Sequence, residues 1–253
     1  MVDLVNKKRV NYDKLVGSSR DFTKQIEWMD KLFKKYGVKT VLDAGCGTGT
    51  HAVLLAKKGY LVSAFDYSKG QVELAKEKAK QNNVKINFYV GDIRDFDFGK
   101  FDAIVSFFAP IMFGCKNKSD LKKAILSIKN SLSPNGIAFI ETMDSKMMES
   151  SGLEILKHAD KDFKAARLAF YDFNKDKKSA KIKYVEVIEN NKKITIDKSE
   201  ANHYYYDKKD FEEVFKSLDI KLINWYSSFN DKKGKYDLFS DKVSWMITPL
   251  FRK

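Results

Sequence analysis

The 253-residue chain has little cysteine and no long apolar run. Its two cysteines, Cys46 and Cys115, lie far apart and form no Cys-x-x-Cys pair, which argues against a disulfide framework and against a zinc site. No stretch is apolar over the roughly 18 residues that a bilayer-spanning helix needs, and residues 1–14 carry charges where a signal peptide would be apolar. We therefore expect a soluble cytoplasmic protein with reduced thiols and no metal.

Arginine is also scarce: only five of the 47 basic residues are arginine, although the net charge is +13. A positive charge of this size raises nucleic acid as a partner, because clustered Lys and Arg follow a phosphate backbone. Bidentate phosphate recognition favours the planar guanidinium, however, and the lysines here are spread along the chain, often beside Asp or Glu. General surface composition is favoured over a surface for an anionic partner, and both interpretations stay open.

Three alternating glycines form the most informative stretch of the chain. Gly45, Gly47 and Gly49 separate a short apolar strand pattern at residues 40–43 from a helical pattern at residues 48–58. Glycine allows positive φ and brings no Cβ to the bend, so a ligand can approach the backbone closely. The first N–H groups of the following helix have no partner within the helix and point toward the same place. The stretch therefore predicts a ligand site.

Asp43 and the glycine spacing narrow the choice of ligand. A dinucleotide fingerprint needs Gly-x-Gly-x-x-Gly, whereas here the glycines alternate and Thr50 stands at the third position. A carboxylate at the strand end would repel a pyrophosphate but can accept hydrogen bonds from an ammonium group. The site is thus predicted to take a cationic, phosphate-free ligand. Residues 43–49, with the pattern Asp-x-Gly-x-Gly-x-Gly, resemble motif I of the class I S-adenosylmethionine-dependent methyltransferases.

This resemblance implies an α/β fold with a doubly wound, seven-stranded, mostly parallel sheet, the Rossmann-like methyltransferase fold. It also implies S-adenosyl-L-methionine as the cofactor and S-adenosyl-L-homocysteine as its product. Helices are expected at residues 21–36, 48–58, 68–81, 118–132 and 208–218, and core strands at residues 40–43, 61–65, 85–90, 101–107, 137–143, 221–226 and 242–247.

The chain is expected to have three parts. Residues 1–144 would form the N-terminal helix and the cofactor-binding core, and residues 207–253 would complete that core. Between them, residues 145–206 show period-two alternation, β-branched and aromatic residues and polar turns, which predict an inserted antiparallel β-sheet after strand five. We expect this insertion to serve as a lid, a substrate-binding part or the surface of a homodimer.

Acidic residues at the ends of the next two strands complete the cofactor set that the resemblance implies. Asp66 follows the glycine turn by about twenty positions, where a carboxylate can meet both ribose hydroxyls. In the family, an acidic residue after strand three accepts a hydrogen bond from the adenine amino group, and the next backbone amide meets the ring; Asp92 and Ile93 match. Tyr67 would lie beside the ligand or be an exposed turn aromatic. His51 is expected to be a neutral wall residue, because a helix N-terminus disfavours positive charge. The expected cofactor-binding residues are Asp43, Gly45, Cys46, Gly47, Gly49, His51, Asp66, Tyr67, Gly91, Asp92, Ile93 and Ser106.

The residues after strand four favour a small-molecule methyl acceptor. Phe108-Ala109-Pro110 is not the Asn/Asp-Pro-Pro-aromatic tetrad with which resembling enzymes hold a nucleobase or a glutamine amino group. The added sheet resembles small-molecule amine methyltransferases, notably the sugar N,N-dimethyltransferases and the glycine/sarcosine group. We expect direct in-line transfer to an amine nitrogen. The rivals are an RNA or protein methyltransferase using the lysine-rich surface, and a non-catalytic protein that uses the fold to bind a partner.

Tyr12 and His203 are the expected catalytic residues. The matching N-terminal tyrosine in resembling enzymes closes over the active site, while the alternative for Tyr12 is packing of the N-terminal arm. His203 returns from the insertion toward the core, and histidine is the usual residue to hold a proton near neutral pH. The alternative for it is a satisfied or surface histidine. Because the cofactor already holds an activated methyl group, we expect positioning residues and no catalytic triad.

Overall fold

The computed structural model describes residue 15 and residues 21–108, 110–147, 152–161, 163–190, 193–230, 233, 235–238 and 246–253. Tyr12 lies outside these described residues. The strands of the central sheet are β1 (Thr40–Ala44), β2 (Leu61–Asp66), β3 (Ile86–Val90), β4 (Phe101–Ser106), β5 (Leu132–Ile140), β6 (Thr142–Met143), β11 (Lys221–Asn230), β12 (Lys235–Leu238) and β13 (Met246–Arg252).

These strands lie in the order β12-β11-β13-β5-β4-β1-β2-β3, and β6 pairs with β13. The five strands from β3 to β5 run parallel, so their carboxyl ends meet at one edge of the sheet. β13 and β11 are antiparallel to their neighbours. This arrangement confirms the expected doubly wound fold. Each expected core strand has a counterpart, the one expected at residues 137–143 is divided into β5 and β6, and β12 is an additional strand.

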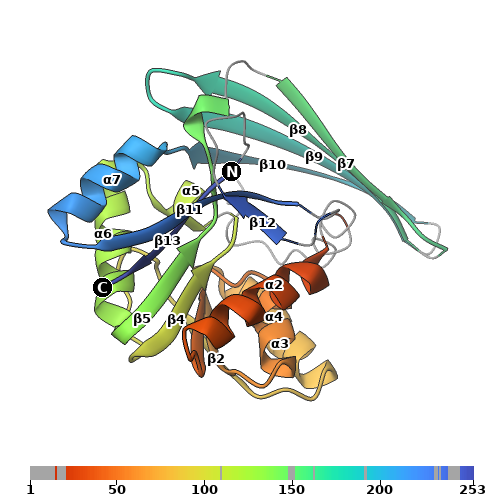
Figure 1. Ribbon diagram of the computed structural model, residues 1–253. Coiled ribbons are helices and arrows are strands. Elements are labelled where there is room, and N and C mark those ends of the chain that lie inside the picture. The colour runs from red at the N-terminus through yellow and green to blue at the C-terminus, as the bar shows by residue number, and fades with distance from the viewer. Residues whose placement is uncertain are drawn as a thin grey trace.

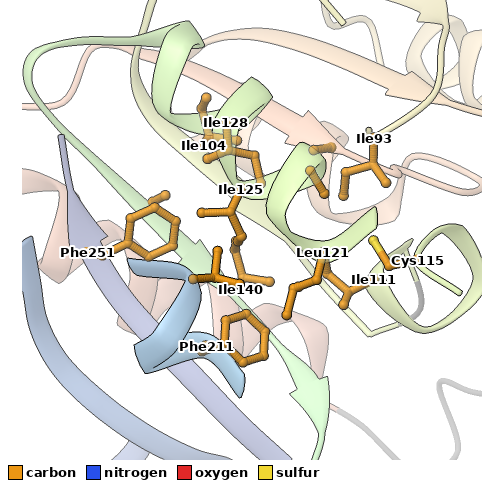
Figure 2. Close-up of a cluster of buried hydrophobic side chains, with 14 of the residues drawn as sticks. Ile93, Ile104, Ile111, Cys115, Leu121, Ile125, Ile128, Ile140, Phe211 and Phe251 are labelled. Carbon is orange, nitrogen blue, oxygen red and sulfur yellow. The ribbon is translucent and has the colours of Figure 1, made fainter. Parts of the chain in front are cut away.

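Helices cover both faces of the central sheet (Figure 1). Their bounds are α2 (Phe22–Lys35), α3 (Thr50–Lys57), α4 (Lys69–Gln81), α5 (Pro110–Gly114), α6 (Lys118–Ser131) and α7 (Lys208–Ser217). α2, α3 and α4 lie on one face, and α6 and α7 lie on the other. Figure 2 shows the core on the α6 and α7 face, where Phe211 and Ile125 from the helices meet Ile140 and Phe251 from the sheet.

The helix starts follow the capping chemistry of the sequence. The Asp21 carboxylate accepts a hydrogen bond from the backbone N–H of Lys24 at 3.0 Å, and the Ser68 hydroxyl accepts one from that of Gln71 at 3.3 Å. Ser68 and Gln71 are the residue types of a capping box, but only the Ser68 half is formed, because the buried Gln71 side-chain oxygen has no partner among the described residues.

Two expected segments differ from the structure. The last core strand covers Met246–Arg252 instead of residues 242–247, and Pro249 pairs with Trp225 inside it. Proline is disfavoured in the middle of a strand, so the sequence pattern does not predict a strand across Pro249. β5 begins at Leu132 and not at residue 137, although Asn135 has a φ of +65° and the pairing with β4 is irregular there.

The insertion forms a separate four-stranded antiparallel sheet, as expected. Its strands are β7 (Gly152–Ala159), β8 (Phe163–Asn174), β9 (Ser179–Asn190) and β10 (Lys193–Tyr204), in the order β10-β9-β8-β7. One face packs on α5, where Ile182 and Tyr205 meet Met112 (Figure 1). The domain boundaries at residues 144 and 206 stay a prediction.

The described residues contain neither a membrane-spanning helix nor a cluster of metal-binding side chains. No helix there combines the length and the apolar character of a membrane crossing. In the same part of the chain, no group of His, Cys, Asp and Glu side chains is arranged to hold a metal ion.

Candidate functional site

The glycine turn joins the end of β1 to the start of α3. Gly45, Gly47 and Gly49 have φ values of +81°, +53° and +80°, the left-handed region that favours glycine. The backbone N–H groups of Gly45 and Cys46 both donate to the Phe65 carbonyl oxygen at 2.8 Å, which ties the turn to β2. The turn is therefore fixed by its own backbone before any ligand binds.

The three glycines differ in what surrounds them. A Cβ added at Gly45 would lie 2.1 Å from the Pro110 Cγ atom, and one at Gly49 would lie 2.8 Å from the Ala75 Cβ atom. A Cβ at Gly47 would meet no atom of the described part of the chain within 4 Å. Gly45 and Gly49 are thus required by close packing, whereas Gly47 leaves open space where a ligand can approach the backbone.

Asp66 connects the end of β2 to the glycine turn. One carboxylate oxygen accepts the backbone N–H of Gly47 at 2.8 Å, and the other accepts that of Ser68 at 2.9 Å. Burial raises the pKa of the Asp66 carboxyl, while these two hydrogen bonds oppose the shift. A carboxylate has about four lone-pair sites, so it can still accept hydrogen bonds from two ligand hydroxyls.

Asp43 is the least satisfied acidic group beside the turn. Its side chain is 1% exposed, and its Oδ2 atom has no hydrogen-bond partner among the residues that the structure describes. Burial raises the pKa of the carboxyl to about 7; the nearby Asp66 carboxylate adds to the shift, and the backbone N–H of Ala52 opposes it. A buried carboxylate with an unpartnered oxygen is suited to a cationic ligand group, as the sequence predicted.

This raised pKa predicts how stability depends on pH. Because the folded-state pKa of Asp43 lies above its ordinary value of 3.8, its contribution to stability is full below 3.8 and is lost as the pH rises through about 7. In Asp43→Asn, we expect this part of the loss to be absent. Chemical denaturation of both proteins between pH 4 and pH 8 measures it, at about 1.4 kcal/mol per unit of pKa shift. Parallel curves for the two proteins would contradict the prediction.

Cys46 and Ser106 lie at the same edge of the sheet. The Cys46 thiol is buried, and burial together with the Asp43 and Asp66 carboxylates raises its pKa well above the ordinary value. It is therefore a neutral wall group and not a thiolate nucleophile. Ser106 ends β4 beside β1, and its fully buried hydroxyl has no partner within the described residues.

The end of β3 brings the remaining expected cofactor residues near β2. The Gly91 N–H donates to the Asp66 carbonyl oxygen at 3.1 Å. Arg94 holds the Asp92 carboxylate, with its Nε atom 3.0 Å from Oδ1, and this contact keeps the pKa of Asp92 below its usual range. Ile93 is buried and Tyr67 is 56% exposed. Their roles toward adenine and ribose stay predictions, and Arg94 is a partner that the sequence did not indicate.

The two histidines of interest lie in different places. The His51 ring stacks on Phe107 at 4.0 Å between centroids, and its Nε2 atom is 3.0 Å from the Gln25 Oε1 atom. His203 is buried, with its Nε2 atom 3.3 Å from the Tyr184 hydroxyl and its Nδ1 atom 3.4 Å from the Tyr205 hydroxyl. His51 thus belongs to the glycine-turn site, and His203 belongs to the interface between the inserted sheet and α5.

Several polar residues of the site were missed by the sequence analysis. Lys78 on α4 reaches the glycine turn, where its ammonium donates to the Thr48 and Thr50 hydroxyls at 3.1 and 2.7 Å. Gln25 and Glu141 are buried near His51 and the end of β5. Gln25 could have been found, because it is a polar residue on the apolar face of its helix. Lys78 carries no signal in the sequence.

Residues 41–136, which span β1 to the irregular start of β5, match the family model described as a methyltransferase domain. A ubiquinone biosynthesis O-methyltransferase of Rickettsia akari is 34% identical over 104 residues, which cover 41% of this chain and 40% of that protein. A protein of Geobacillus sp. strain WCH70, named as a methyltransferase, is 29% identical over 142 residues. The chain spans about half the length of the curated relatives it matches.

Solved structures share the fold of the central sheet and of the insertion. An S-adenosylmethionine-dependent methyltransferase from Clostridium acetobutylicum ATCC 824 superposes with a TM-score of 0.81 at 19% identity, over 95% of each chain. A sugar N-methyltransferase from Streptoalloteichus sp. ATCC 53650 has a TM-score of 0.78 at 14% identity, over 100% of this chain and 96% of that one. At such identities the likeness establishes the fold alone, which is that of S-adenosylmethionine-dependent methyltransferases.

Proposed function

We propose that the chain is an S-adenosylmethionine-dependent methyltransferase that acts on a small molecule, at an amine nitrogen. The observation that carries the proposal is the buried Asp43 carboxylate, whose unpartnered oxygen lies beside an open glycine turn. A dinucleotide would bring a pyrophosphate to this turn, whereas S-adenosylmethionine brings an ammonium and a sulfonium. The charge of the site therefore favours this cofactor over nicotinamide or flavin dinucleotides.

The residues present fit the cofactor. Asp43 would accept from the α-ammonium group, the Gly47 backbone would approach the ligand, and Asp66 would hold the ribose hydroxyls. Asp92 and Ile93 would meet the adenine. When bound, the cofactor supplies a methyl group activated on a sulfonium. The protein then has to align a lone pair of the acceptor with the S–CH₃ axis, and such positioning can lower a barrier by about 7–11 kcal/mol.

Support for a small-molecule amine comes from the other end of the site. α5 begins at Pro110, shortly after Phe108, and the inserted sheet packs on this helix. The sheet would then cover the acceptor, and His203, buried where the sheet meets α5, would orient it. Tyr12 stays a second candidate for closing over the acceptor. A homodimer through the inserted sheet also stays a prediction, since the sheet exposes large apolar side chains at Leu153, Ile155, Phe170, Ile194 and Ile196.

Methyl transfer from S-adenosylmethionine labelled in its methyl group tests the proposal. The purified chain is incubated with glycine, sarcosine and 3- and 4-amino sugars, and in parallel with phenols, catechols and total RNA. We expect label in an amine pool. Label only in the phenols would move the acceptor to oxygen, which is the acceptor named for the Rickettsia relative. Label only in RNA would show that the lysine-rich surface recruits the substrate, and both results would refute the amine proposal.

A further inference from the structure

A chain of hydrogen bonds between buried side chains links the end of β5 to His51. Glu141 follows β5 and is fully buried, and its Oε1 atom accepts a hydrogen bond from the Tyr236 hydroxyl at 3.2 Å. The Tyr236 oxygen accepts in turn from the Gln25 amide nitrogen. The Gln25 oxygen lies 3.0 Å from the Nε2 atom of His51. Four segments distant in the sequence, β5, β12, α2 and α3, each contribute one member.

The order of donors and acceptors in this chain fixes the state of the histidine. The Tyr236 hydroxyl donates to the Glu141 Oε1 atom, so its single proton is used in that bond. The Tyr236 oxygen must then accept from the Gln25 NH₂ group, which turns the Gln25 carbonyl oxygen toward His51. That oxygen only accepts, so the His51 Nε2 atom carries the proton. In a neutral imidazole, Nδ1 is then the basic nitrogen.

Aromatic rings hold both ends of the chain in place. His51 is stacked on Phe107 with 13° between the ring planes, and the Phe22 ring meets its edge at 5.2 Å. Tyr236 lies against Phe139, with 4.9 Å between the ring centroids. The imidazole is thus restrained on its face and at its edge as well as through Nε2.

Folding alone does not explain such a network. Glu141 and Gln25 are 0% and 1% exposed among apolar and aromatic residues, where burying polar groups costs free energy even when they are bonded. Apolar residues of similar volume would fill the same space with less cost. What the polar residues add is a single tautomer and a single position for the ring of His51.

His51 lies where that control would matter. It is in the first turn of α3, two residues after Gly49, and its stacking partner Phe107 directly follows β4. The ring is therefore between the glycine turn and the edge of the sheet at which parallel strands end. Under the function proposed above, this is where cofactor and acceptor meet.

We propose that His51 takes a proton from the amine that is to be methylated. Glu141, Tyr236 and Gln25 are positioning residues for His51. This rests on the proposed function. An ammonium acceptor gives one N–H proton to the Nδ1 atom of His51, which yields a neutral amine and an imidazolium. The amine lone pair forms the new N–C bond while the C–S bond of the bound cofactor breaks and its electron pair stays on sulfur. The imidazolium then loses its proton to water.

His203 is less suited to this task. Its two ring nitrogens face the hydroxyls of Tyr184 and Tyr205, and each hydroxyl can donate or accept. These contacts do not select one tautomer. His203 is therefore assigned to orienting the acceptor, and the proton transfer is assigned to His51.

Nitrogen-15 NMR of the wild-type chain at neutral pH tests the tautomer directly, because protonated and lone-pair ring nitrogens differ in chemical shift. The chain has only three histidines, so His158→Gln and His203→Gln identify the signals that belong to His51. We expect a protonated Nε2 and an unprotonated Nδ1. A His51 ring that is charged, or that is protonated at Nδ1, would overturn the proposal. This test does not require a substitution of Glu141, Tyr236 or Gln25.

Tyr236→Phe tests the positioning role, because it removes both hydrogen bonds and keeps the ring. We expect a mixture of His51 tautomers and a kcat lower by roughly tenfold with the fastest amine of the screen, the usual size of such indirect effects. The affinity for S-adenosylhomocysteine should stay the same. Glu141→Gln, which keeps the shape and removes the obligatory acceptor, should act in the same direction. His51→Gln should lower kcat by about 100-fold, as loss of a general base does.

Tyr226→Phe is the matched control. Tyr226 is a buried tyrosine that, like Tyr236, packs against Phe139. Its hydroxyl contacts Asn224 and not the side chains that are hydrogen-bonded to His51. It should keep the wild-type tautomer and kcat. A Tyr236→Phe protein with the wild-type spectrum and kcat would overturn the positioning role. The expected tautomer in a chain that fails to bind S-adenosylhomocysteine would instead refute the proposed function, and with it the proton transfer.

Discussion

Gly45→Ala is expected to lower the free energy of unfolding by about 3 kcal/mol. The residue would have to keep a φ of +81°, which costs about 1–2 kcal/mol for an L-residue. Its new Cβ would also lie 2.1 Å from the Pro110 Cγ atom, and such overpacking costs typically about 1–3 kcal/mol. Denaturant unfolding followed by circular dichroism measures the change.

Gly37→Ala is the matched control for this substitution. Gly37 also has a positive φ, +64°, but a Cβ there would meet nothing within 4 Å. It should therefore show only the backbone part of the cost, about 1–2 kcal/mol. Equal losses for the two variants would mean that the contact between the turn and Pro110 is not rigid.

Asp66→Ala is expected to weaken binding of S-adenosylhomocysteine by about 100-fold or more. Under the proposed function, the substitution removes the acceptor for two ribose hydroxyls, and it also removes the acceptor for the backbone N–H of Gly47, which shapes the turn. Hydrogen bonds to a charged group contribute about 1.5–3 kcal/mol each, and every 1.4 kcal/mol is about tenfold in affinity. Isothermal titration calorimetry at one pH and salt concentration measures the loss.

Asp102→Ala serves as its control. The Asp102 carboxylate also accepts two backbone N–H groups, those of Lys39 and Thr40, each at 3.0 Å. It lies at the start of β4, whereas the proposed site lies at the strand ends. Asp102→Ala should therefore lose stability and keep its affinity for S-adenosylhomocysteine. Unchanged affinity in Asp66→Ala would show that the ribose is not bound there.

The parts of the site that could be predicted from the sequence are set by local geometry. The glycines of residues 45–49 need positive φ, and Asp43 and Asp66 follow apolar strand patterns, so their places at one sheet edge follow from the parallel order of β1 and β2. The inserted sheet could also be predicted from local geometry, because side chains alternate between the two faces of a strand with period two.

The parts that could not be predicted depend on contacts between distant segments. Gln25 and Tyr236 are 211 residues apart and meet only because β12 extends the sheet beyond β11, next to α2. Glu141 looks like any strand-end residue until its neighbours are placed. Likewise, the bond between Arg94 and Asp92 depends on the path of the loop after β3. Periodicity carries no information on such pairings.

Calorimetric titration of the wild-type chain with S-adenosylhomocysteine is the most direct test of the central claim. We expect saturable binding at one site per chain, which Asp66→Ala weakens and Asp102→Ala leaves unchanged. Absence of any binding heat, with the protein shown to be folded by circular dichroism, would contradict it. The chain would then have the fold without the cofactor, and the charge of Asp43 would need another ligand.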